Sequence, residues 1–323
     1  MSKAVVIHEP GGPEVFRVED HDVSEPGAGE IVLRQTAVGL NFLDVYQRSG
    51  LYPLQMPAIV GNEAAGVVEQ VGEGVQTVQP GDRVAYAPSI GAYAQFRTIA
   101  VDRVVQLPDS IDDNQAAAMM LKGTTVEYLI RRTYAVKAGE TVLFHAAAGG
   151  VGLIACQWLN HLGVTVIGTV GSEEKAALAK AHGCHHTINY RDEDIAARVR
   201  ELTDGKGVPV VYDSVGKDTF DASIDSLQPR GMFVNFGNAS GPAPAVPPGL
   251  LAQKGSLYFT RPSLQAYTAT REELEASSAA LFEVVQSGAV KIEIKQTYPL
   301  AEVAQAHTDL EARKTTGSTI LIP

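Results

Sequence analysis

A glycine-rich turn between a strand-like run and a helix-like run could bind the phosphates of a nucleotide. The turn reads Ala147-Ala148-Gly149-Gly150-Val151-Gly152 and follows residues 141–146, whose β-branched and apolar side chains predict a buried strand. A helical pattern follows the turn, and residues 164–170 predict a second strand. In such a unit Gly149 lets the backbone approach a pyrophosphate, while Gly152 lets the helix pack closely on the strand. The order of elements therefore predicts a dinucleotide site, with an ordinary tight turn as the alternative.

The end of the second predicted strand indicates which dinucleotide binds. An NAD site carries a carboxylate there for the ribose 2′-hydroxyl, whereas this chain has Gly171 and Ser172, followed by Lys175. A small residue, a hydroxyl and an ammonium suit a 2′-phosphate. Glu173 and Glu174 count against this reading, unless they are the acidic residues favoured at a helix N-terminus. We expect NADPH.

Composition narrows the class of protein. The chain has 323 residues, with 45% hydrophobic and 20% charged side chains, which is enough for one large or two ordinary domains. A formal net charge of −11 argues against a nucleic-acid partner. The sequence predicts neither a signal peptide nor a membrane-spanning segment. Two cysteines offer no disulfide framework, and we therefore expect a cytoplasmic protein.

Predicted elements divide the chain into two kinds of structure. Short strands separated by turn signals fill the first third, which predicts an antiparallel barrel or sandwich; they span residues 4–7, 31–38, 66–71, 83–86, 94–99 and 104–107. Residues 112–120 and 124–132 predict two helices. From residue 141 strands and helices alternate, which predicts a doubly wound parallel sheet. A long helix at 271–287 and strands at 292–294 and 318–322 end the chain, and this tail is expected to rejoin the β-rich part.

Two stretches carry a resemblance to a known family. One combines Gly139-Glu140, Leu143, the glycine-rich turn and Gln157; the other is residues 38–52, VGLNFLDVYQRSGLY. With them the whole chain resembles the medium-chain dehydrogenase/reductase superfamily, and within it the quinone oxidoreductases related to ζ-crystallin. The resemblance implies an α/β protein in which a Rossmann domain, residues 124–264, interrupts a GroES-like catalytic domain, residues 1–123 and 265–323. It also implies an active site in the cleft between the domains and a homodimer formed through the Rossmann domain.

The ligands of a catalytic zinc are replaced in this sequence. Zinc alcohol dehydrogenases of the superfamily have a cysteine near position 41 and a Gly-His-Glu further on, whereas this chain has Asn41 and Gly61-Asn62-Glu63. A catalytic zinc needs three protein ligands of thiolate, imidazole or carboxylate type. The sequence therefore argues against a metal.

A reaction without a metal suits a quinone. A quinone is already electrophilic, so positioning and a hydroxyl that donates a hydrogen bond can suffice for hydride addition. The resemblance places Tyr46 and Tyr52 beside the nicotinamide, with packing aromatics as the alternative. Asn41 and Asp44 are implied as polar groups that hold the segment and the cofactor, although Asp44 could simply start a helix.

The resemblance also implies further NADPH contacts. Lys122 and Thr125 belong to a segment that resembles the one that meets the nicotinamide end, and the other contacts lie in loops that follow the predicted strands. Each of these could instead be a plain strand-end turn. The residues are Lys122, Thr125, Tyr190, Ser214, Val215, Phe236, Gly237, Asn238, Phe259 and Arg261.

Three alternatives stay open. A reductase of 2-alkenals or enones would need the same metal-free hydride addition. A crystallin-like protein that binds NADPH without catalysis, or binds RNA, would leave Tyr46 and Tyr52 dispensable. His182-Gly183-Cys184-His185-His186 could bind a metal, but a helix that stops at Gly183 explains it better. The leading hypothesis is an NADPH-dependent reductase of a small-molecule quinone.

Overall fold

The computed structural model describes residues 2–323. Contacts divide the chain into two compact units. Unit 1 comprises Met1–Thr124, Thr268–Gln286 and Ile292–Pro323, and unit 2 comprises Thr125–Tyr267 and Ser287–Lys291. The expected domain limits, 1–123 with 265–323 and 124–264, stay a prediction. The two units change over after Thr124 and after Tyr267, within a few residues of those limits, and Ser287–Lys291 also belongs to unit 2.

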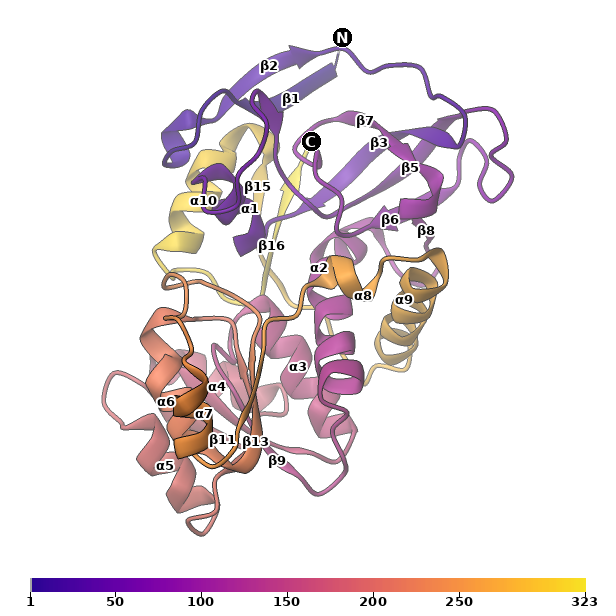
Figure 1. Ribbon diagram of the computed structural model, residues 1–323. Coiled ribbons are helices and arrows are strands. Elements are labelled where there is room, and N and C mark those ends of the chain that lie inside the picture. The colour runs from indigo at the N-terminus through magenta and orange to yellow at the C-terminus, as the bar shows by residue number, and fades with distance from the viewer. Residues whose placement is uncertain (1) are drawn as a thin grey trace. The chain divides into compact units, whose positions relative to one another are not determined.

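Unit 2 is built on a six-stranded parallel sheet (Figure 1). The strand order is β11-β10-β9-β12-β13-β14. The first strand of the unit, β9, therefore lies in the middle of the sheet, and successive strands are added first on one side of it and then on the other, as in dinucleotide-binding folds. The bounds are β9 (Thr141–Phe144), β10 (Thr165–Val170), β11 (His186–Asn189), β12 (Val208–Asp213), β13 (Leu227–Asn235) and β14 (Tyr258–Thr260). The expected doubly wound sheet is confirmed.

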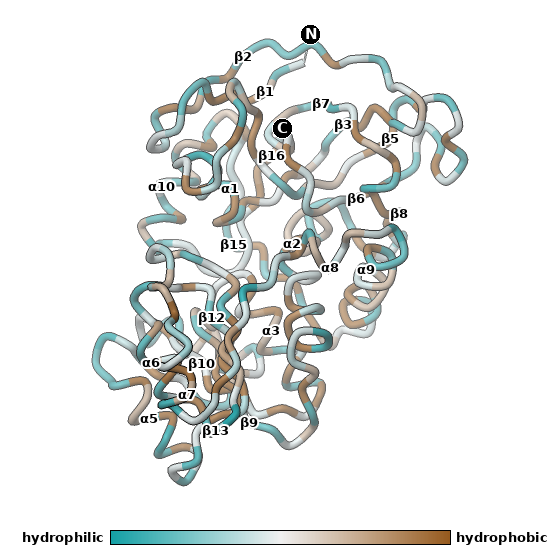
Figure 2. Tube along the Cα trace, in the orientation of Figure 1, coloured by the Kyte–Doolittle hydropathy of each residue, from teal (hydrophilic) through white to brown (hydrophobic). Residues whose placement is uncertain are grey.

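Helices flank this sheet and bury its strands on both sides. They are α3 (Gly150–His161), α4 (Glu173–Ala181), α5 (Ile195–Leu202), α6 (Phe220–Ser226) and α7 (Pro248–Gln253), and a short helix, α8 (Leu264–Tyr267), follows the last strand. Helix α3 contacts α4, and α5 contacts α6. Because both faces of a parallel sheet are covered, its strands are almost continuously apolar; Leu143, Ile167 and Val211 from three neighbouring strands share one buried core. Figure 2 shows apolar residues along these strands and polar residues in the outer loops.

Unit 1 is largely β-structure in two sheets. The larger follows the order β15-β16-β3-β5-β6-β8, with β7 also paired to β3, and the smaller is β2-β1-β4. All pairs except β15 with β16 are antiparallel. The bounds are β1 (Ser2–Ile7), β2 (Arg17–His21), β3 (Glu30–Gly39), β4 (Ala58–Ile59), β5 (Ala64–Val71), β6 (Arg83–Tyr86), β7 (Phe96–Ala100), β8 (Val105–Gln106), β15 (Ile294–Pro299) and β16 (Ser318–Ile322). The tail does join this part, because Ile320 and Leu321 pair with β3.

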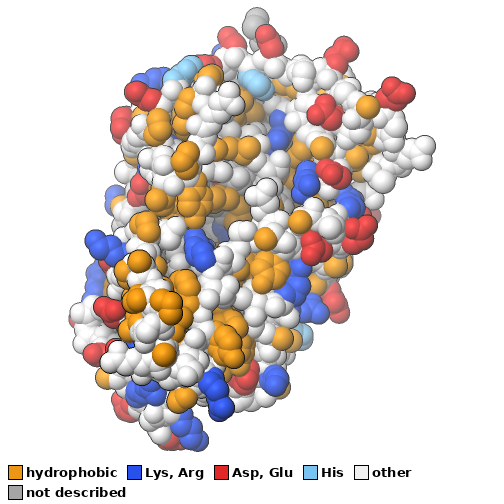
Figure 3. Space-filling view, in the orientation of Figure 1, with side chains coloured by type: hydrophobic (Ala, Val, Ile, Leu, Met, Phe, Trp, Pro, Cys, Tyr) orange, Lys and Arg blue, Asp and Glu red, His pale blue; other side chains and the backbone are white. Residues whose placement is uncertain are grey.

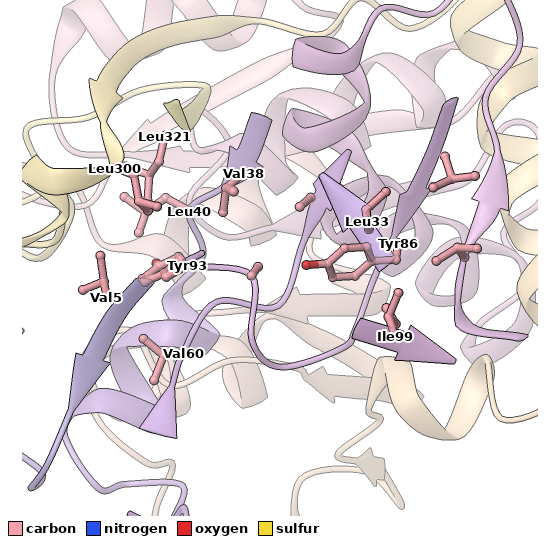
Figure 4. Packing of buried hydrophobic residues seen from close by; sticks show 14 of the residues in the cluster. Val5, Leu33, Val38, Leu40, Val60, Tyr86, Tyr93, Ile99, Leu300 and Leu321 are labelled. Carbon is pink, nitrogen blue, oxygen red and sulfur yellow. The ribbon is translucent and has the colours of Figure 1, made fainter. Parts of the chain in front are cut away.

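One hydrophobic core fills unit 1 and draws on residues from both ends of the chain. Leu300 and Leu321 from the tail lie beside Leu40, and Val5 and Leu33 from the first strands belong to the same cluster (Figure 4). Two buried tyrosines belong to the same core. The return of the tail therefore completes the interior of unit 1.

The expectation of separate helices at 112–120 and 124–132 is wrong. A single helix, α2 (Asp113–Tyr128), runs through this stretch and continues as a π-helix, Leu129–Thr133. Gly123 lies within it, and a Cβ there would come within 2.4 Å of Leu281 on α9 (Arg271–Gln286). The glycine is thus needed for close helix packing and does not break the helix.

Other differences concern short elements. Helix α10 (Val303–Glu311) and strand β2 lack a clear sequence pattern and were not expected, and helix α1 (Phe42–Arg48) was expected only as the alternative interpretation of Asp44. The strand expected at 292–294 begins at Ile294 and runs to Pro299. Among the helices between residues 2 and 323, none has both the length and the apolar character that crossing a bilayer requires.

Candidate active site

The glycine-rich turn of unit 2 has the geometry that a phosphate site needs. Strand β9 ends at Phe144, and α3 begins at Gly150 with Gly149 as its N-cap residue. A Cβ on Gly152 would lie 2.4 Å from the Ala146 carbonyl oxygen and 2.6 Å from that of Ala147, so only glycine allows the helix to lie this close to the turn. A Cβ on Gly149 would meet one atom only, at 3.3 Å, and the space beyond it is open. Open space at the N-terminus of a helix is what a pyrophosphate requires.

The end of β10 gathers the residues expected around a 2′-phosphate. A Cβ on Gly171 would lie 2.4 Å from the Tyr190 hydroxyl, which shows that the tyrosine lies directly over the glycine. The Ser172 hydroxyl accepts the Lys175 backbone N–H at 3.3 Å and caps α4. Glu173 and Glu174 are exposed in the first turn of that helix, where acidic side chains are favoured. The structure therefore brings Gly171, Ser172, Lys175 and Tyr190 together.

A buried aspartate organises the loops after β12 and β13. One carboxylate oxygen of Asp213 accepts the backbone N–H groups of Val215 and Gly216, at 2.7 and 3.0 Å. A Cβ on Gly237 would lie 2.4 Å from the Ser214 carbonyl oxygen, so the two loops touch. The Asp213 side chain has no exposed surface and thus shapes the loops from the interior of the unit, a role that was not predicted from the sequence.

The same aspartate belongs to a buried polar network. Its second oxygen accepts hydrogen bonds from the hydroxyls of Thr219 and Ser223, at 2.7 and 3.0 Å. The Ser223 hydroxyl also lies 3.0 Å from Nε2 of His145, whose Nδ1 lies 3.1 Å from the Thr169 hydroxyl. Burial lowers the pKa of His145, so the ring is neutral and holds β9 to β10 by hydrogen bonds.

The remaining cofactor predictions are placed as follows. Lys122 and Thr125 lie inside α2, on either side of the division between the units, and not in a turn. Phe236 follows β13, and Arg261 follows β14 with its guanidinium donating to the Asn235 carbonyl at 3.1 Å. The other predicted residues of unit 2 lie at or just after the carboxyl ends of parallel strands; they are Ala147, Val151, Val215, Asn238 and Phe259. This edge is where such folds bind dinucleotides.

These features fit NADPH. The turn leaves open space beside Gly149, and a hydroxyl, a lysine and a tyrosine replace the carboxylate at the end of β10. Gly149–Gly152 would hold the pyrophosphate, and Ser172, Lys175 and Tyr190 would hold the 2′-phosphate.

In unit 1 the predicted catalytic segment forms helix α1. Asn41 is its N-cap residue, and the Asp44 carboxylate accepts the Asn41 backbone N–H at 2.9 Å. Asp44 therefore does start a helix, as the alternative reading held. The rings of Tyr46 and Tyr52 meet edge to face at 5.4 Å, and Phe42 lies 6.2 Å from Tyr46. The segment thus presents an aromatic group.

Asp44 is a fully buried carboxylate surrounded by donors. It accepts the Asn62 side-chain amide at 2.7 Å and the Tyr93 hydroxyl at 2.9 Å in addition to the Asn41 N–H. Burial raises the pKa of Asp44 to about 6, and the three hydrogen bonds and the Lys122 charge oppose that rise. Asp44 is therefore a carboxylate at neutral pH but gains a proton on mild acidification.

Glu63 and Lys122 form a second buried cluster, which includes Asn41, the residue at the position of a zinc-ligand cysteine in the zinc enzymes of the resembled superfamily. The Glu63 carboxylate accepts the Lys122 ammonium at 3.0 Å, the Asn41 side-chain amide at 2.8 Å and the Leu121 N–H at 2.8 Å. Two donors and a cation thus occupy the oxygens that a metal would need. These residues do not fit a zinc ion.

The histidine-rich run in unit 2 behaves as a helix end. Helix α4 ends at Ala181, and Gly183 has a φ of 87°, the left-handed conformation expected of a stop. His185 Nδ1 accepts the Val166 N–H at 3.1 Å and is thereby used in the fold. Over residues 2–323, His, Cys, Asp and Glu side chains nowhere gather in a group of three that could hold a metal.

Sequence reasoning missed a third feature of unit 1, a buried row of side chains behind α1. The Tyr93 hydroxyl lies 2.9 Å from Nε2 of His307, and His307 Nδ1 lies 3.1 Å from Nη1 of Arg48. Arg48 also pairs with both Glu311 oxygens, at 2.8 and 2.9 Å. A lone tyrosine and a lone histidine 214 positions apart leave no spacing signal in one sequence.

Comparisons with known proteins agree with this architecture. Residues 27–109 match the alcohol dehydrogenase GroES-like domain, and residues 150–281 match the zinc-binding dehydrogenase family. A quinone oxidoreductase of Pseudomonas aeruginosa is 55% identical, and a 2-haloacrylate reductase of a Burkholderia species is 48% identical; the alignments cover all of this chain and 100% and 99% of those proteins.

A solved structure is similar over nearly the whole chain. It is the quinone oxidoreductase of Escherichia coli in complex with NADPH, with a TM-score of 0.98, 50% identity, and coverage of 99% of this chain and 100% of that one. Family models, relatives and structure all point the same way. The chain belongs to the medium-chain dehydrogenase/reductase superfamily and, within it, to the quinone oxidoreductases.

Proposed function

We propose that this protein is an NADPH-dependent quinone reductase that works without a metal. The observation that carries the proposal is the pairing of a dinucleotide-binding unit, whose β10 end lacks a carboxylate, with a catalytic segment in which Asn41, Glu63 and Lys122 replace a metal site. We assign cofactor binding to residues 124–264 and the quinone to residues 1–123 with 265–323.

The roles of the chain's residues follow from this chemistry. NADPH supplies the hydride from C4 of its nicotinamide. Tyr46 and Tyr52 orient the quinone and donate hydrogen bonds to its oxygens, where negative charge develops. Asn41 and Asp44 hold the helix that carries Tyr46. Lys122, as a buried cation, stabilises negative charge near the same helix.

A second candidate is the reduction of a conjugated carbon–carbon double bond. A relative that is 48% identical is named a 2-haloacrylate reductase, and its substrate has such a bond. Hydride addition to an activated alkene also needs positioning more than a Lewis acid. The same residues could therefore serve both reactions.

Initial rates decide between the two. NADPH oxidation is followed with a small panel of quinones and a panel of enones that includes a 2-haloacrylate, with a chelator present, and is repeated with NADH. We expect chelator-insensitive turnover of quinones that favours NADPH. Turnover of enones alone would replace the proposal with the second candidate, and NADPH binding without turnover of either would favour a crystallin-like role.

The two tyrosines are tested in the same assay. Tyr46→Phe and Tyr52→Phe keep the aromatic contact and remove only the hydroxyl, so we expect kcat/KM for the quinone to fall about tenfold while NADPH affinity is unchanged. Tyr298→Phe, which removes a half-buried hydroxyl bonded to Asp309, is the control. Full activity in both active-segment variants would make these residues packing aromatics.

We also propose a homodimer formed through the Rossmann unit, and a cytoplasmic location. The motivations are the family resemblance and the two cysteines, both free and buried. Sedimentation equilibrium should give twice the 34.3 kDa of one chain, and a monomer mass at micromolar concentration would contradict the dimer.

Nucleic acid is not an expected partner; on the face drawn in Figure 3, basic side chains are mixed with acidic ones.

A further inference from the structure

We propose that Tyr93 and His307 are positioning residues for the reaction: together they hold Asp44 and Arg48, and through them the helix that carries Tyr46. The inference rests on the proposed function for its kinetic consequences, and on the geometry of unit 1 for the rest.

Helix α1 depends on outside contacts. It has seven residues, which is too short for a helix to be stable by itself. Asp44, Gln47 and Arg48 are spaced so that they share one face of the helix, and all three are buried in hydrogen bonds. Phe42 and Tyr46 share another face and form the aromatic group. The buried polar face therefore sets where the aromatic face points.

The hydrogen bonds along this face have one consistent direction. Arg48 can only donate, so Nδ1 of His307 must accept and its proton lies on Nε2. Nε2 then donates to the Tyr93 oxygen, and the Tyr93 hydroxyl donates to Asp44. Burial lowers the pKa of His307 well below its usual value, and the Arg48 charge adds to this, so the ring stays neutral and keeps this tautomer.

The row joins distant parts of unit 1 to one short helix. Tyr93 lies between β6 and β7, and His307 and Glu311 lie on α10, near the end of the chain. Tyr93 and His307 have no exposed surface, whereas the Glu311 side chain is 36% exposed. Arg48, at the C-terminal end of α1, is held by His307, Glu311 and the Gly11 carbonyl, and Asp44, in the first turn, is held by Tyr93, so α1 is fixed at both ends.

The charge of Asp44 is essential to this arrangement. A carboxylate can accept from Asn41, Asn62 and Tyr93 at once, whereas a carboxylic acid loses acceptor capacity. The charged and titratable groups around Asp44 and Tyr93 are the buried pair of Lys122 and Glu63, Arg48 on α1, His307 on α10, and Tyr86 on β6, which interacts with Asp44 only through its charge. Loss of the Tyr93 donor removes one interaction that lowers the pKa of Asp44, so the acid would form at higher pH.

Tyr93→Phe tests the proposal with little disturbance, because the ring stays in the core. Tyr86→Phe is the matched control: Tyr86 is equally buried, belongs to the same core and bonds to Gln35 and Arg97, without contact to α1 (Figure 4). His307→Leu and the double variant Tyr93→Phe/His307→Leu complete a cycle. Each protein is examined by quinone kinetics between pH 5 and 8, by NADPH binding, and by hydrogen exchange of the α1 amides.

We expect Tyr93→Phe to lower kcat/KM for the quinone about tenfold, with unchanged NADPH affinity and an acid-side loss of activity that begins at higher pH. The α1 amides should exchange faster in this variant than in Tyr86→Phe. Adding His307→Leu should cost little more, since the row is already broken.

Two results would overturn the proposal. One is a Tyr93→Phe enzyme that matches Tyr86→Phe in rate, pH profile and α1 exchange. The other is strictly additive losses from Tyr93 and His307. Hydrogen exchange requires no substrate, so a wild-type enzyme that ignores quinones would refute the proposed function while the exchange data still decided the positioning role.

Discussion

Asp44 shows at the scale of one residue how a buried charge is retained at a cost. Its pKa lies near 6 in the folded chain against 3.8 as the reference value. For an acid whose folded pKa is raised, the folded state binds more protons than the unfolded state between these values, so stability falls as pH rises from about 4 to 6. The ionised form thus costs roughly 3 kcal/mol at neutral pH. We interpret that cost as the price of a carboxylate that can accept three donors.

We therefore expect the substitution Asp44→Asn to change how the stability of the protein depends on pH. The free energy of unfolding of wild type minus that of the variant should decrease as pH rises from 4 to 7, by up to roughly 3 kcal/mol. Denaturant unfolding at half-unit pH steps measures it, with exposed Asp109→Asn as the control. A difference that grows with pH would show that hydrogen bonds outweigh desolvation and would reverse the assigned direction of the pKa shift.

Candidate site residues that belong to a sequence motif could be predicted from the sequence, whereas those outside any motif could not. Gly149, Gly152 and Lys175 follow from a strand–turn–helix order that sequence displays directly. Asp213, Tyr93 and His307 act through contacts that form only when the chain folds. The residues next to them in the sequence form no pattern that predicts those contacts.

At the scale of elements, one glycine supports a correct prediction and another lies inside an incorrect one. Gly152 was expected to allow close helix packing, and the Ala146 carbonyl oxygen lies only 2.4 Å from the position of its Cβ. Separate helices were expected at 112–120 and 124–132, but one helix spans this stretch and contains Gly123. Its true constraint is Leu281, which belongs to a helix more than 150 residues later in the chain. Local pattern cannot reveal a packing partner so distant.

At the scale of elements, helix α4 provides a test of the preference for NADPH over NADH. Lys175 lies in its first turn, beside the Ser172 cap, whereas Lys180 lies exposed in its last turn. Lys175→Ala should weaken NADPH binding about tenfold and leave NADH binding unchanged, because only NADPH has the 2′-phosphate. Fluorescence titration with both cofactors measures this, and Lys180→Ala is the matched control. Equal weakening for the two cofactors would move Lys175 away from the 2′-phosphate.

At the scale of the whole molecule, the alternation of strands and helices was enough to predict the parallel sheet of unit 2, since each βαβ step is local. For unit 1 the short strands predicted an antiparallel barrel or sandwich, but not the order of its strands. Its strand order depends on pairs such as Gly39 with Ile320, which lie at opposite ends of the sequence. The return of the tail was expected, but the place of β16 inside the sheet was not.

That place has a consequence for the order of folding during synthesis. Strand β16 lies between β15 and β3, so the larger sheet of unit 1 is incomplete until residues 318–322 have been synthesised. The sheet of unit 2 is complete at Thr260. The sheet of unit 2 can therefore fold before residues 1–124 can pair with β16.

A chain that stops at Thr316 lacks β16 and tests this order. We expect limited proteolysis to cleave residues 1–124 quickly, while unit 2 resists cleavage and still binds NADPH. The full-length chain is the control. If both units were cleaved equally fast, unit 2 would need unit 1 in order to fold, and the nascent protein would have no early folded part.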